Sequence, residues 1–412
     1  MTLSDLRETT KTQTARLGGR NGELERHALA ELPEPQSHAL IISGIRRCGK
    51  STLLRQFAAK QKKAFFHLNF DDLRLSGFSP EDFRLLDILI GEKKAALLVF
   101  DEIQTVDRWE LYVRQKLDEG YQVAITGSNA SLLSRELGTK LTGRHITKEL
   151  FPFSYGEYCE FTGQTTGLAS LETYLKQGGF PEYLKTGDRD ILSQLQTDIL
   201  YRDIAVRYRL RDVSSLKRLF TYLVSNPAQL VSPSKLLQLT GLRSPTTVLE
   251  YISYFELSYL IQLVPCFAWS LKKQSLAPKK VYVIDNGIIL TSSLSFTDNE
   301  GALLENFVYT VLRARTRDVF YFAGSEKECD FIVNPHGRPL CIQVCSELTV
   351  DNRRRETRGL FQAMDFFGQN EGIIITRNER DIILEQGKEI RVIPAWEFAQ
   401  ETAKDGLEPA LM

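Results

Sequence analysis

Short apolar runs alternate with amphipathic stretches along the first 150 residues of the chain. The runs expected to form strands are 39–43, 64–72, 95–100, 122–126 and 146–150. Short runs of this kind, bounded by polar residues, are typical of strands buried in a parallel sheet. The stretch 51–60 between the first two runs has its apolar residues at helical spacing. Strands and helices that alternate in this way predict an α/β layer with a doubly wound parallel sheet.

The first strand leads directly into a glycine-containing loop. Gly44–Ser51 fits the pattern G-x-x-x-x-G-K-[ST] of the phosphate-binding loop. Its glycines let successive backbone N–H groups face a phosphate chain. Lys50 can then reach the β- and γ-phosphates, while the Ser51 hydroxyl can ligate Mg²⁺. A helix follows the loop, so the phosphates would lie at a helix N-terminus, which attracts anions. The sequence therefore predicts that the chain binds a nucleoside triphosphate.

The backbone of this loop is expected to make most of the phosphate contacts. The residues expected around the nucleotide are Gly44, Arg46, Arg47, Cys48, Gly49, Lys50, Ser51 and Thr52. The side chains of Arg46 and Arg47 are expected to face solvent or another domain.

An acidic pair follows the strand at 95–100. Asp101 and Glu102 stand where a P-loop enzyme carries its Walker B carboxylates. In that role Asp101 would hold Mg²⁺, and Glu102 would polarise the attacking water. The alternative is a pair of solvated carboxylates at a strand end. The preceding P-loop favours the catalytic interpretation.

Two further polar residues are candidates for contact with the γ-phosphate. Asn129, with Ser128 beside it, follows the strand at 122–126 and could sense the γ-phosphate; its alternative role is to cap the next helix. Arg144 lies in a turn before the last strand of the layer. It could act as an arginine finger, in the same chain or in a neighbouring subunit, or it could pair with a surface carboxylate.

Several motifs together resemble one family. They are Gly44–Ser51, Phe100–Gln104 (FDEIQ), Thr126–Ala130 (TGSNA), Leu141–Arg144, Phe151–Tyr158 and Gly178–Tyr183 (GGFPEY). The chain resembles the AAA-class P-loop ATPases of bacteria and archaea whose C-terminal half is a domain of unknown function. The resemblance covers nearly the whole chain and implies ATP with Mg²⁺ as ligands.

The resemblance also implies a series of four parts. An AAA-like P-loop domain with an N-terminal helical extension is expected at 1–160, followed by a helical connector at 161–213. A winged-helix-like domain is expected at 214–292 and an α/β restriction-endonuclease-like domain at 293–412.

The middle segment itself has the pattern of a winged helix-turn-helix. Ser232-Pro233 and Ser244-Pro245 each open a helix, and two strand-like runs follow at 259–267 and 279–284. Residues 211–290 carry nine Lys or Arg and four Asp or Glu, a net charge of +5. Part of this excess is at Lys272-Lys273 and Lys279-Lys280, where a wing could contact DNA phosphates. The alternative is a contact between domains or subunits, because the second helix begins with few side chains suited to base recognition.

The last part has the layout of a nuclease core that lacks its catalytic lysine. Glu305 on a helix and Asp330 on a strand could hold a metal ion. The positions that should carry the second carboxylate and the lysine are Gln343 and Cys345, which are poor substitutes. The nearest basic residues expected are 353–355 on the following helix. We therefore expect a binding or assembly module without nuclease activity.

Composition limits the remaining possibilities. The chain has 412 residues, and its 52 Lys and Arg balance its 52 Asp and Glu, so it is not polycationic as a whole. Six cysteines are scattered without a C-x-x-C pair, which predicts buried or partly exposed thiols. No apolar run approaches a membrane span and the N-terminus is polar, so a cytoplasmic protein without a membrane partner is expected.

Three hypotheses follow for function. The first is a Mg²⁺-dependent ATPase whose hydrolysis drives conformational change or assembly of the C-terminal domains, possible partners being a second copy, DNA and an unidentified protein. The second is a nucleotide-gated switch or scaffold with slow turnover. The third, least favoured, is an ATP-dependent nuclease. Glu102 favours the first, because a switch has less need of a carboxylate that polarises water.

Overall fold

The structure is a computed structural model that describes residues 1–15, 23–128, 141, 143–242, 244–292, 300–325 and 327–405. The chain divides into two compact units. Unit 1 comprises 1–151 and 257–259, and unit 2 comprises 152–256 and 260–412. No helix in the described ranges is long and apolar enough to cross a bilayer. The six cysteines carry free thiols, five of them buried and Cys345 half-buried, as predicted.

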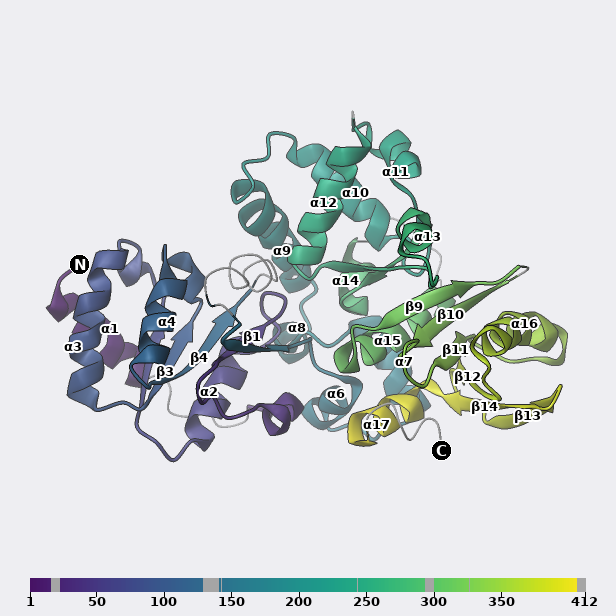
Figure 1. Cartoon of the computed structure of the whole chain (residues 1–412), viewed down its shortest axis with the longest axis horizontal. Coiled ribbons are helices and arrows are strands. Elements are labelled where there is room, and N and C mark those ends of the chain that lie inside the picture. The colour runs from purple at the N-terminus through teal and green to yellow at the C-terminus, as the bar shows by residue number, and fades with distance from the viewer. Residues whose placement is uncertain are drawn as a thin grey trace. The chain divides into compact units, whose positions relative to one another are not determined.

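Unit 1 is built on a five-stranded sheet in which every neighbouring pair is parallel. Its strands are β1 (Ala39–Ser43), β2 (Phe65–Asn69), β3 (Leu97–Asp101), β4 (Gln122–Gly127) and β5 (His145–Glu149). Their order in the sheet is β2-β3-β4-β1-β5. In Figure 1, β1, β3 and β4 lie side by side in the purple-to-teal part of the chain. The predicted P-loop sheet is confirmed, and each predicted strand lies within a few residues of its expected place.

Helices pack on this sheet through apolar side chains. They are α1 (Leu3–Ala15), α2 (Lys50–Lys60), α3 (Phe83–Lys93) and α4 (Trp109–Asp118), with the short 3₁₀ helices η1 (His27–Glu31), η2 (Leu73–Leu75), η3 (Pro80–Asp82) and η4 (Ile103–Thr105). Helices α2 and α4 pack on β4, while α1 and α3 pack on β2. Every residue of β1 and β3 is buried, which explains why these runs are apolar without alternation.

Unit 2 begins with a run of helices. They are α6 (Tyr155–Thr162), α7 (Leu168–Gln177), α8 (Pro181–Thr186), α9 (Asp190–Asp198) and the π-helical η6 (Ile199–Val206). Gly178 and Gly179 join α7 to α8, and a Cβ on Gly179 would lie 2.1 Å from the Phe153 carbonyl oxygen. The buried Asp285 carboxylate accepts from the Gly179 N–H at 2.6 Å and from the Gly287 N–H at 2.8 Å. The glycine pair is therefore required by close packing of the backbone.

The middle segment contains three helices and a small antiparallel sheet. Its elements are α10 (Val213–Val224), β6 (Leu230–Val231), α11 (Pro233–Thr240), α12 (Pro245–Leu257), β7 (Ile261–Val264), α13 (Leu271–Leu276) and β8 (Lys279–Val283). The strand order is β6-β8-β7. Ser232 caps α11 by accepting from the Lys235 N–H, as the sequence predicts. The expected hairpin is formed by β7 and β8, and α13 lies in the connection between them.

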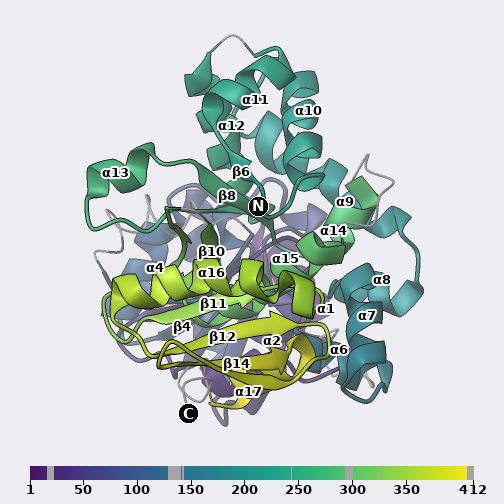
Figure 2. The same cartoon turned by 90° about the vertical axis from the view of Figure 1, so that its right-hand side faces the viewer.

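The last part of unit 2 is a six-stranded mixed sheet between helices. Its helices are α14 (Asn286–Ser292), α15 (Glu300–Arg315), α16 (Val350–Phe367) and α17 (Ala395–Asp405). Its strands are β9 (Val319–Ala323), β10 (Glu328–Val333), β11 (Leu340–Val344), β12 (Glu371–Thr376), β13 (Asp381–Glu385) and β14 (Lys388–Pro394), in the order β13-β14-β12-β11-β10-β9. In Figure 2, α16 lies across β11 and β12.

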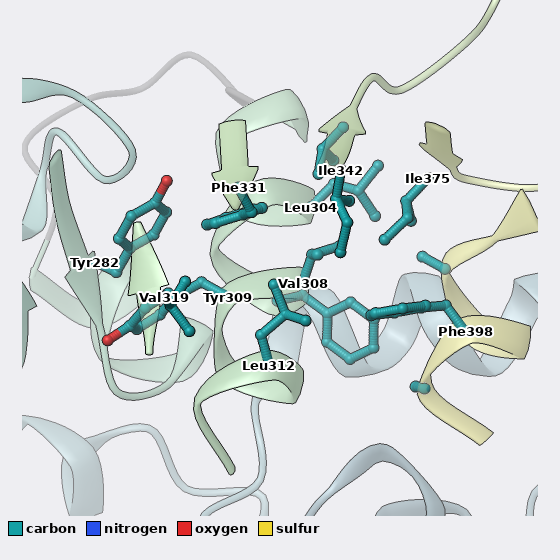
Figure 3. Close-up of a cluster of buried hydrophobic side chains, with 14 of the residues drawn as sticks. Tyr282, Leu304, Val308, Tyr309, Leu312, Val319, Phe331, Ile342, Ile375 and Phe398 are labelled. Atoms are coloured by element: carbon teal, nitrogen blue, oxygen red, sulfur yellow. The ribbon is translucent and has the colours of Figure 1, made fainter. Parts of the chain in front are cut away.

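Two apolar clusters hold this sheet between its helices. In the first, Leu304, Val308 and Leu312 of α15 pack with side chains of the sheet and of α17 (Figure 3). In the second, Leu360 and Met364 of α16 pack with different side chains of the sheet, and the half-buried Cys345 packs against them. Burial of large aliphatic and aromatic side chains contributes about 1.5–3 kcal/mol each before entropy is counted.

Candidate nucleotide site

The phosphate-binding loop joins β1 to α2 in unit 1. Gly44 has φ of 153° and Gly49 has φ of 102°, values that favour glycine. A Cβ on Gly44 would lie 2.1 Å from the Leu150 carbonyl oxygen, so a side chain there would collide with the backbone after β5. Helix α2 begins at Lys50, and no side chain caps its N-terminus. Its first N–H groups therefore lack a protein partner of the capping type, which suits a bound phosphate.

Lys50 is buried within the loop. Its side chain is 5% exposed, and its Nζ donates to the Ile45 carbonyl oxygen at 3.0 Å. It forms no ion pair with any residue that the structure describes. Ser51 is exposed and Thr52 is half-buried at the start of α2. The ammonium is thus held by one backbone oxygen and has further hydrogen-bonding capacity for an anion.

The other loop side chains take different directions. The Cys48 thiol is fully buried and donates to the Leu150 carbonyl oxygen at 3.4 Å, and burial raises its pKa. Arg46 is half-buried and Arg47 is exposed with φ of 64°. The Cys48 side chain therefore anchors the loop to the chain after β5.

Arg26 supports the loop from outside the motif, and sequence reasoning missed it. Its side chain is 3% exposed, and its guanidinium donates to the Cys48 carbonyl oxygen at 2.6 Å and to the Phe151 carbonyl oxygen at 2.9 Å. A Cβ on Gly49 would lie 2.8 Å from this guanidinium. Arg26 thus ties the loop to the end of the layer. Nothing in the polar stretch around it indicates this contact, which joins residues 125 positions apart.

The acidic pair lies at the end of β3. Asp101 is 2% exposed, and Glu102 is half-buried with φ of 52°, a left-handed conformation that is costly outside glycine. Thr126 at the end of β4 bridges the pair: its hydroxyl donates to the Asp101 carboxylate and accepts from the Glu102 N–H at 3.1 Å. Thr126 is a second residue that sequence reasoning missed, since a lone threonine near a strand end carries no distinct signal.

The Glu102 carboxylate is held by two polar side chains. It accepts from the Gln104 amide and from the Ser128 hydroxyl, the latter at 3.3 Å. Burial raises the pKa of Glu102, and the Lys50 charge opposes that rise. A raised pKa makes the carboxylate a better proton acceptor. Because β1, β4 and β3 are adjacent and parallel, their carboxyl ends place the loop, Thr126 and the acidic pair at one sheet edge.

The two remaining candidates do not join this edge. Asn129 lies outside the described residues. Arg144 precedes β5, and its carbonyl oxygen accepts from the N–H of Ala39, the first residue of β1. It therefore lies at the amino end of the strands, about 16 Å from the phosphate loop for five residues of strand. Its exposed guanidinium pairs with Asp118 at the end of α4. In this conformation Arg144 cannot act on the nucleotide of its own chain.

The expected nuclease layout needs two corrections. Gln343 and Cys345 do not face Glu305: the Gln343 amide donates to Glu356 of α16 at 3.4 Å, and Cys345 packs on the α16 side. The basic residue near the carboxylates is Lys280 of β8, not an arginine of α16. Its Nζ lies 3.1 Å from Glu305, 2.9 Å from Glu328 and 2.9 Å from Asp330.

These four residues, called here the Lys280 cluster, compensate one another's charges. Lys280 is 1% exposed; its ammonium donates hydrogen bonds to Glu305 and Asp330 and forms an ion pair with Glu328. Burial lowers the pKa of Lys280, but the carboxylates outweigh it and hold the pKa above its usual value. Burial, reinforced by Asp330, raises the pKa of Glu305 to about 7. Among the described residues, no three His, Cys, Asp or Glu side chains are arranged to hold a metal. Lys280 is also unavailable to DNA phosphates, contrary to expectation.

Comparison with known proteins agrees with the layout of unit 1. A model described as an AAA domain matches residues 36–159, and a model of a domain of unknown function (DUF8612) matches residues 168–300. An uncharacterized protein of Methanocaldococcus jannaschii, MJ1544, is 33% identical over 390 residues, 87% of each chain. An uncharacterized protein of Haemophilus influenzae is 29% identical over 377 residues, 86% of this chain and 93% of that one.

Solved structures give a more distant likeness. Cdc6p from Pyrobaculum aerophilum is similar with 14% identity and a TM-score of 0.26, over 68% of this chain and 88% of that one. The Orc1 protein of Aeropyrum pernix in complex with DNA is similar with 12% identity and a TM-score of 0.23, over 75% of this chain and 94% of that one. Scores this low do not bear on function. The extended match to the archaeal relative and the AAA model do establish kinship: the chain belongs to the family of AAA-class P-loop ATPases that carry a C-terminal domain of unknown function.

Proposed function

We propose that this chain is a Mg²⁺-dependent ATPase. The observation that carries the proposal is that a lysine without a carboxylate partner among the described residues, an uncapped helix N-terminus and a braced acidic pair meet at one sheet edge. Such a set matches the charge of a triphosphate with its metal: cationic and N–H groups for phosphate oxygens, and hydroxyl and carboxylate oxygens for a hard cation.

Each residue has a distinct role in this proposal. Lys50 neutralises charge on the β- and γ-phosphates, and the hydroxyl of Ser51 with Asp101 holds the metal. Mg²⁺, when bound, supplies charge neutralisation on the phosphate oxygens. Glu102 orients the attacking water and accepts its proton, a task that its raised pKa favours. Asn129 is proposed to read the γ-phosphate. Hydrolysis would then change the conformation or assembly of unit 2.

Arg144 is proposed to act between subunits. Its exposed position at the amino end of β5 leaves it accessible to a neighbouring copy, so a homo-oligomer is part of the proposal. DNA is proposed as a further partner. It would contact the middle segment, which we interpret as a winged helix from its order of elements. We also propose a cytoplasmic location, because no apolar run in the sequence approaches the length of a membrane span.

Single-turnover hydrolysis tests the proposal. The Glu102→Gln variant should bind ATP normally and hydrolyse it roughly 10²–10⁴ times more slowly than wild type. The Lys50→Ala variant is the matched control, because it should lose nucleotide binding itself. Equal rates in wild type and Glu102→Gln would instead support the slow switch, in which binding alone is the signal.

The nuclease alternative is not favoured by the Lys280 cluster. Lys280 brings an ammonium to Glu305 and Asp330, but it occupies the space between carboxylates that a metal would need. Incubation of linear and plasmid DNA with saturating protein, ATP and Mg²⁺ or Mn²⁺ should leave the DNA intact. Cleavage that disappears in Asp330→Asn would reinstate this alternative.

A further inference from the structure

The connection between β7 and β8 exposes unusually large apolar side chains. Trp269 is 66% exposed, while Leu271 and Leu276 of α13 are 78% and 76% exposed. In Figure 2, α13 lies at the left of the view. An exposed tryptophan ring offers a flat apolar face to solvent, and large exposed apolar groups that gather at one place mark interaction sites. The ATPase chemistry proposed above makes no use of this segment.

Trp269 rests on other aromatic rings. Its ring meets Phe267 edge to face, with centroids 5.0 Å apart and planes at 83°. It lies 6.5 Å from Phe366, which is 46% exposed, with planes only 24° apart. His336 and Phe367 lie within similar distances. Contacts of this kind hold the ring in place, so Trp269 is a supported platform, and its exposure does not result from a loose loop.

Two lysines stand beside this platform. Lys272 and Lys273 on α13 are exposed, and neither forms an ion pair with a residue in the part of the chain that the structure describes. The segment 211–290 has a net charge of +5 in sequence, of which Lys280 is neutralised within its own cluster. Within this segment, Lys272 and Lys273 are the exposed cations nearest to Trp269 in the sequence. An anionic partner with flat rings would complement both features.

We propose that Trp269, Phe366, Lys272 and Lys273 bind single-stranded nucleic acid. An unstacked base would lie on the Trp269 face, and the ammonium groups would contact the backbone phosphates. A duplex cannot use this platform, because its base faces are already stacked. The proposal specifies the nucleic-acid contact suggested above for the middle segment and rests on that part of the proposed function.

The spacing on α13 argues against a membrane as the partner. Leu271 and Leu276 are five residues apart, so at 100° per residue they point about 140° away from each other. An amphipathic helix that enters a lipid surface needs its apolar side chains on one stripe. Helices of that kind also carry a long polar face, whereas α13 offers only two lysines between its leucines. Stacking on Trp269 and Phe366, with phosphate contacts from Lys272 and Lys273, is the arrangement that this surface can offer.

Fluorescence anisotropy on the full-length protein without nucleotide tests the proposal. The probes are labelled dT20, rU20 and a 20-base-pair duplex of mixed sequence. We expect dT20 to bind more tightly than the duplex, and the rU20 arm shows whether RNA is bound as well. Trp269→Ala should weaken dT20 binding on the order of tenfold, and Trp269→Phe should retain most of it. Lys272→Ala/Lys273→Ala should reduce the slope of log Kd against log[salt] by about 1.4.

Matched controls remove similar groups elsewhere. Leu384→Ala truncates an apolar side chain that is 75% exposed, and Lys60→Ala/Lys62→Ala removes two exposed lysines of unit 1; both should bind dT20 like wild type. Duplex binding without dT20 binding would overturn this inference and leave the DNA contact standing. Binding to neither probe would overturn both, while ATP hydrolysis remains a separate measurement. Sedimentation with anionic vesicles that depends on Trp269 would assign the surface to lipid instead.

Discussion

Lys50 and Lys280 are both buried, one in each unit, but their relations to carboxylates are opposite. In unit 1, Lys50 donates to one backbone oxygen and pairs with no carboxylate in the described residues, although the acidic pair lies at the same sheet edge. In unit 2, Lys280 forms ion pairs with Glu305, Glu328 and Asp330. Both ammonium groups are nearly inaccessible to water. The same chemical groups thus form an unsatisfied site in one unit and a satisfied cluster in the other.

The partners of a buried cation distinguish a binding site from a structural ion pair. A buried cation with spare hydrogen-bonding capacity is costly unless a ligand completes its contacts. A buried cation that already has three anionic partners gains little from a ligand, and its removal leaves buried charge uncompensated. We therefore expect substitutions at Lys50 to affect function and substitutions at Lys280 to affect stability.

The largest effect is expected from Lys280→Met. The methionine keeps the length of the side chain but leaves three carboxylates without their cation, so unit 2 should lose about 3–5 kcal/mol of unfolding free energy. Lys50→Met should change stability by less than about 1 kcal/mol, because one hydrogen bond to a backbone oxygen is lost. Urea unfolding measures both, and amide exchange with mass spectrometry assigns the loss to a unit.

Two further variants test whether the loss in Lys280→Met comes from uncompensated charge in the cluster. Lys273→Met removes an exposed lysine of unit 2 that forms no ion pair with any described residue, and should stay within about 0.5 kcal/mol of wild type. Lys280→Met combined with Glu305→Gln and Asp330→Asn should recover part of the loss, because the uncompensated charges are gone. Full stability in Lys280→Met alone would show that the Lys280 cluster does not stabilise unit 2.

The units should also respond oppositely to acid. Burial lowers the pKa of His67 on β2 to about 4, and burial raises the pKa of Asp285 in unit 2 to about 6. From pH 7 to 5 the unfolded chain protonates His67 before the folded unit 1 does, so unit 1 loses stability. Folded unit 2 takes up a proton on Asp285, and on Glu305, that the unfolded chain does not bind until about pH 4, so unit 2 gains stability.

The loss in unit 1 should reach about 2 kcal/mol, and the gain in unit 2 about 3–4 kcal/mol because two groups contribute. Amide exchange measured at pH 5.0 and 7.5, corrected for intrinsic rates, follows the two units separately. His67→Gln and Asp285→Asn are the controls: His67→Gln should flatten the response of unit 1 only, and Asp285→Asn should reduce the response of unit 2 only, leaving the part due to Glu305. Parallel responses in both units would contradict this assignment of the titrating groups.

Sequence alone predicts the parts of the nucleotide site that depend on neighbours in the chain. The loop Gly44–Ser51, the strands around it and the pair Asp101-Glu102 follow from local patterns of apolar and polar residues. Thr126 and Arg26 do not, because their partners lie 25 and 125 positions away. The pairing of β3 with β4 brings Thr126 to Asp101, and the pairing of β1 with β5 brings the phosphate loop close to Phe151, so that Arg26 contacts both.

The errors have equally specific causes. Alternation along β11 predicts that Gln343 and Cys345 share a face, but it cannot say which helix that face meets. Lys280 comes from a strand 50 positions before Asp330, so no motif spacing includes it. Arg144 precedes a parallel strand, which already places it at the edge opposite the phosphate loop; the sequence contained that information.

A smaller effect than those of Lys280→Met and of acid is expected from a substitution at Thr126. Thr126→Val removes the hydroxyl that bridges Asp101 and the Glu102 N–H, so the Asp101 carboxylate, which is proposed to hold the metal, would lose its fixed position. We expect hydrolysis under single turnover to slow about 10–100-fold while ATP binding changes little. Thr126→Ser keeps the hydroxyl and should stay within a few fold of wild type. An unchanged rate in Thr126→Val would remove Thr126 from the site.

The smallest effect is expected from Arg144→Ala in dilute, monomeric protein. Its ion pair with Asp118 is exposed at both ends, and such pairs contribute less than about 1 kcal/mol. Because Arg144 lies at the edge opposite the phosphate loop, hydrolysis by a single chain should not change within error. Asp118→Asn breaks the same pair and keeps the guanidinium, so it separates the two roles. If activity rises with protein concentration in wild type and Asp118→Asn but not in Arg144→Ala, the arginine acts on a neighbouring subunit. A loss of activity in monomeric Arg144→Ala would contradict the geometry, because it requires Arg144 to reach its own nucleotide.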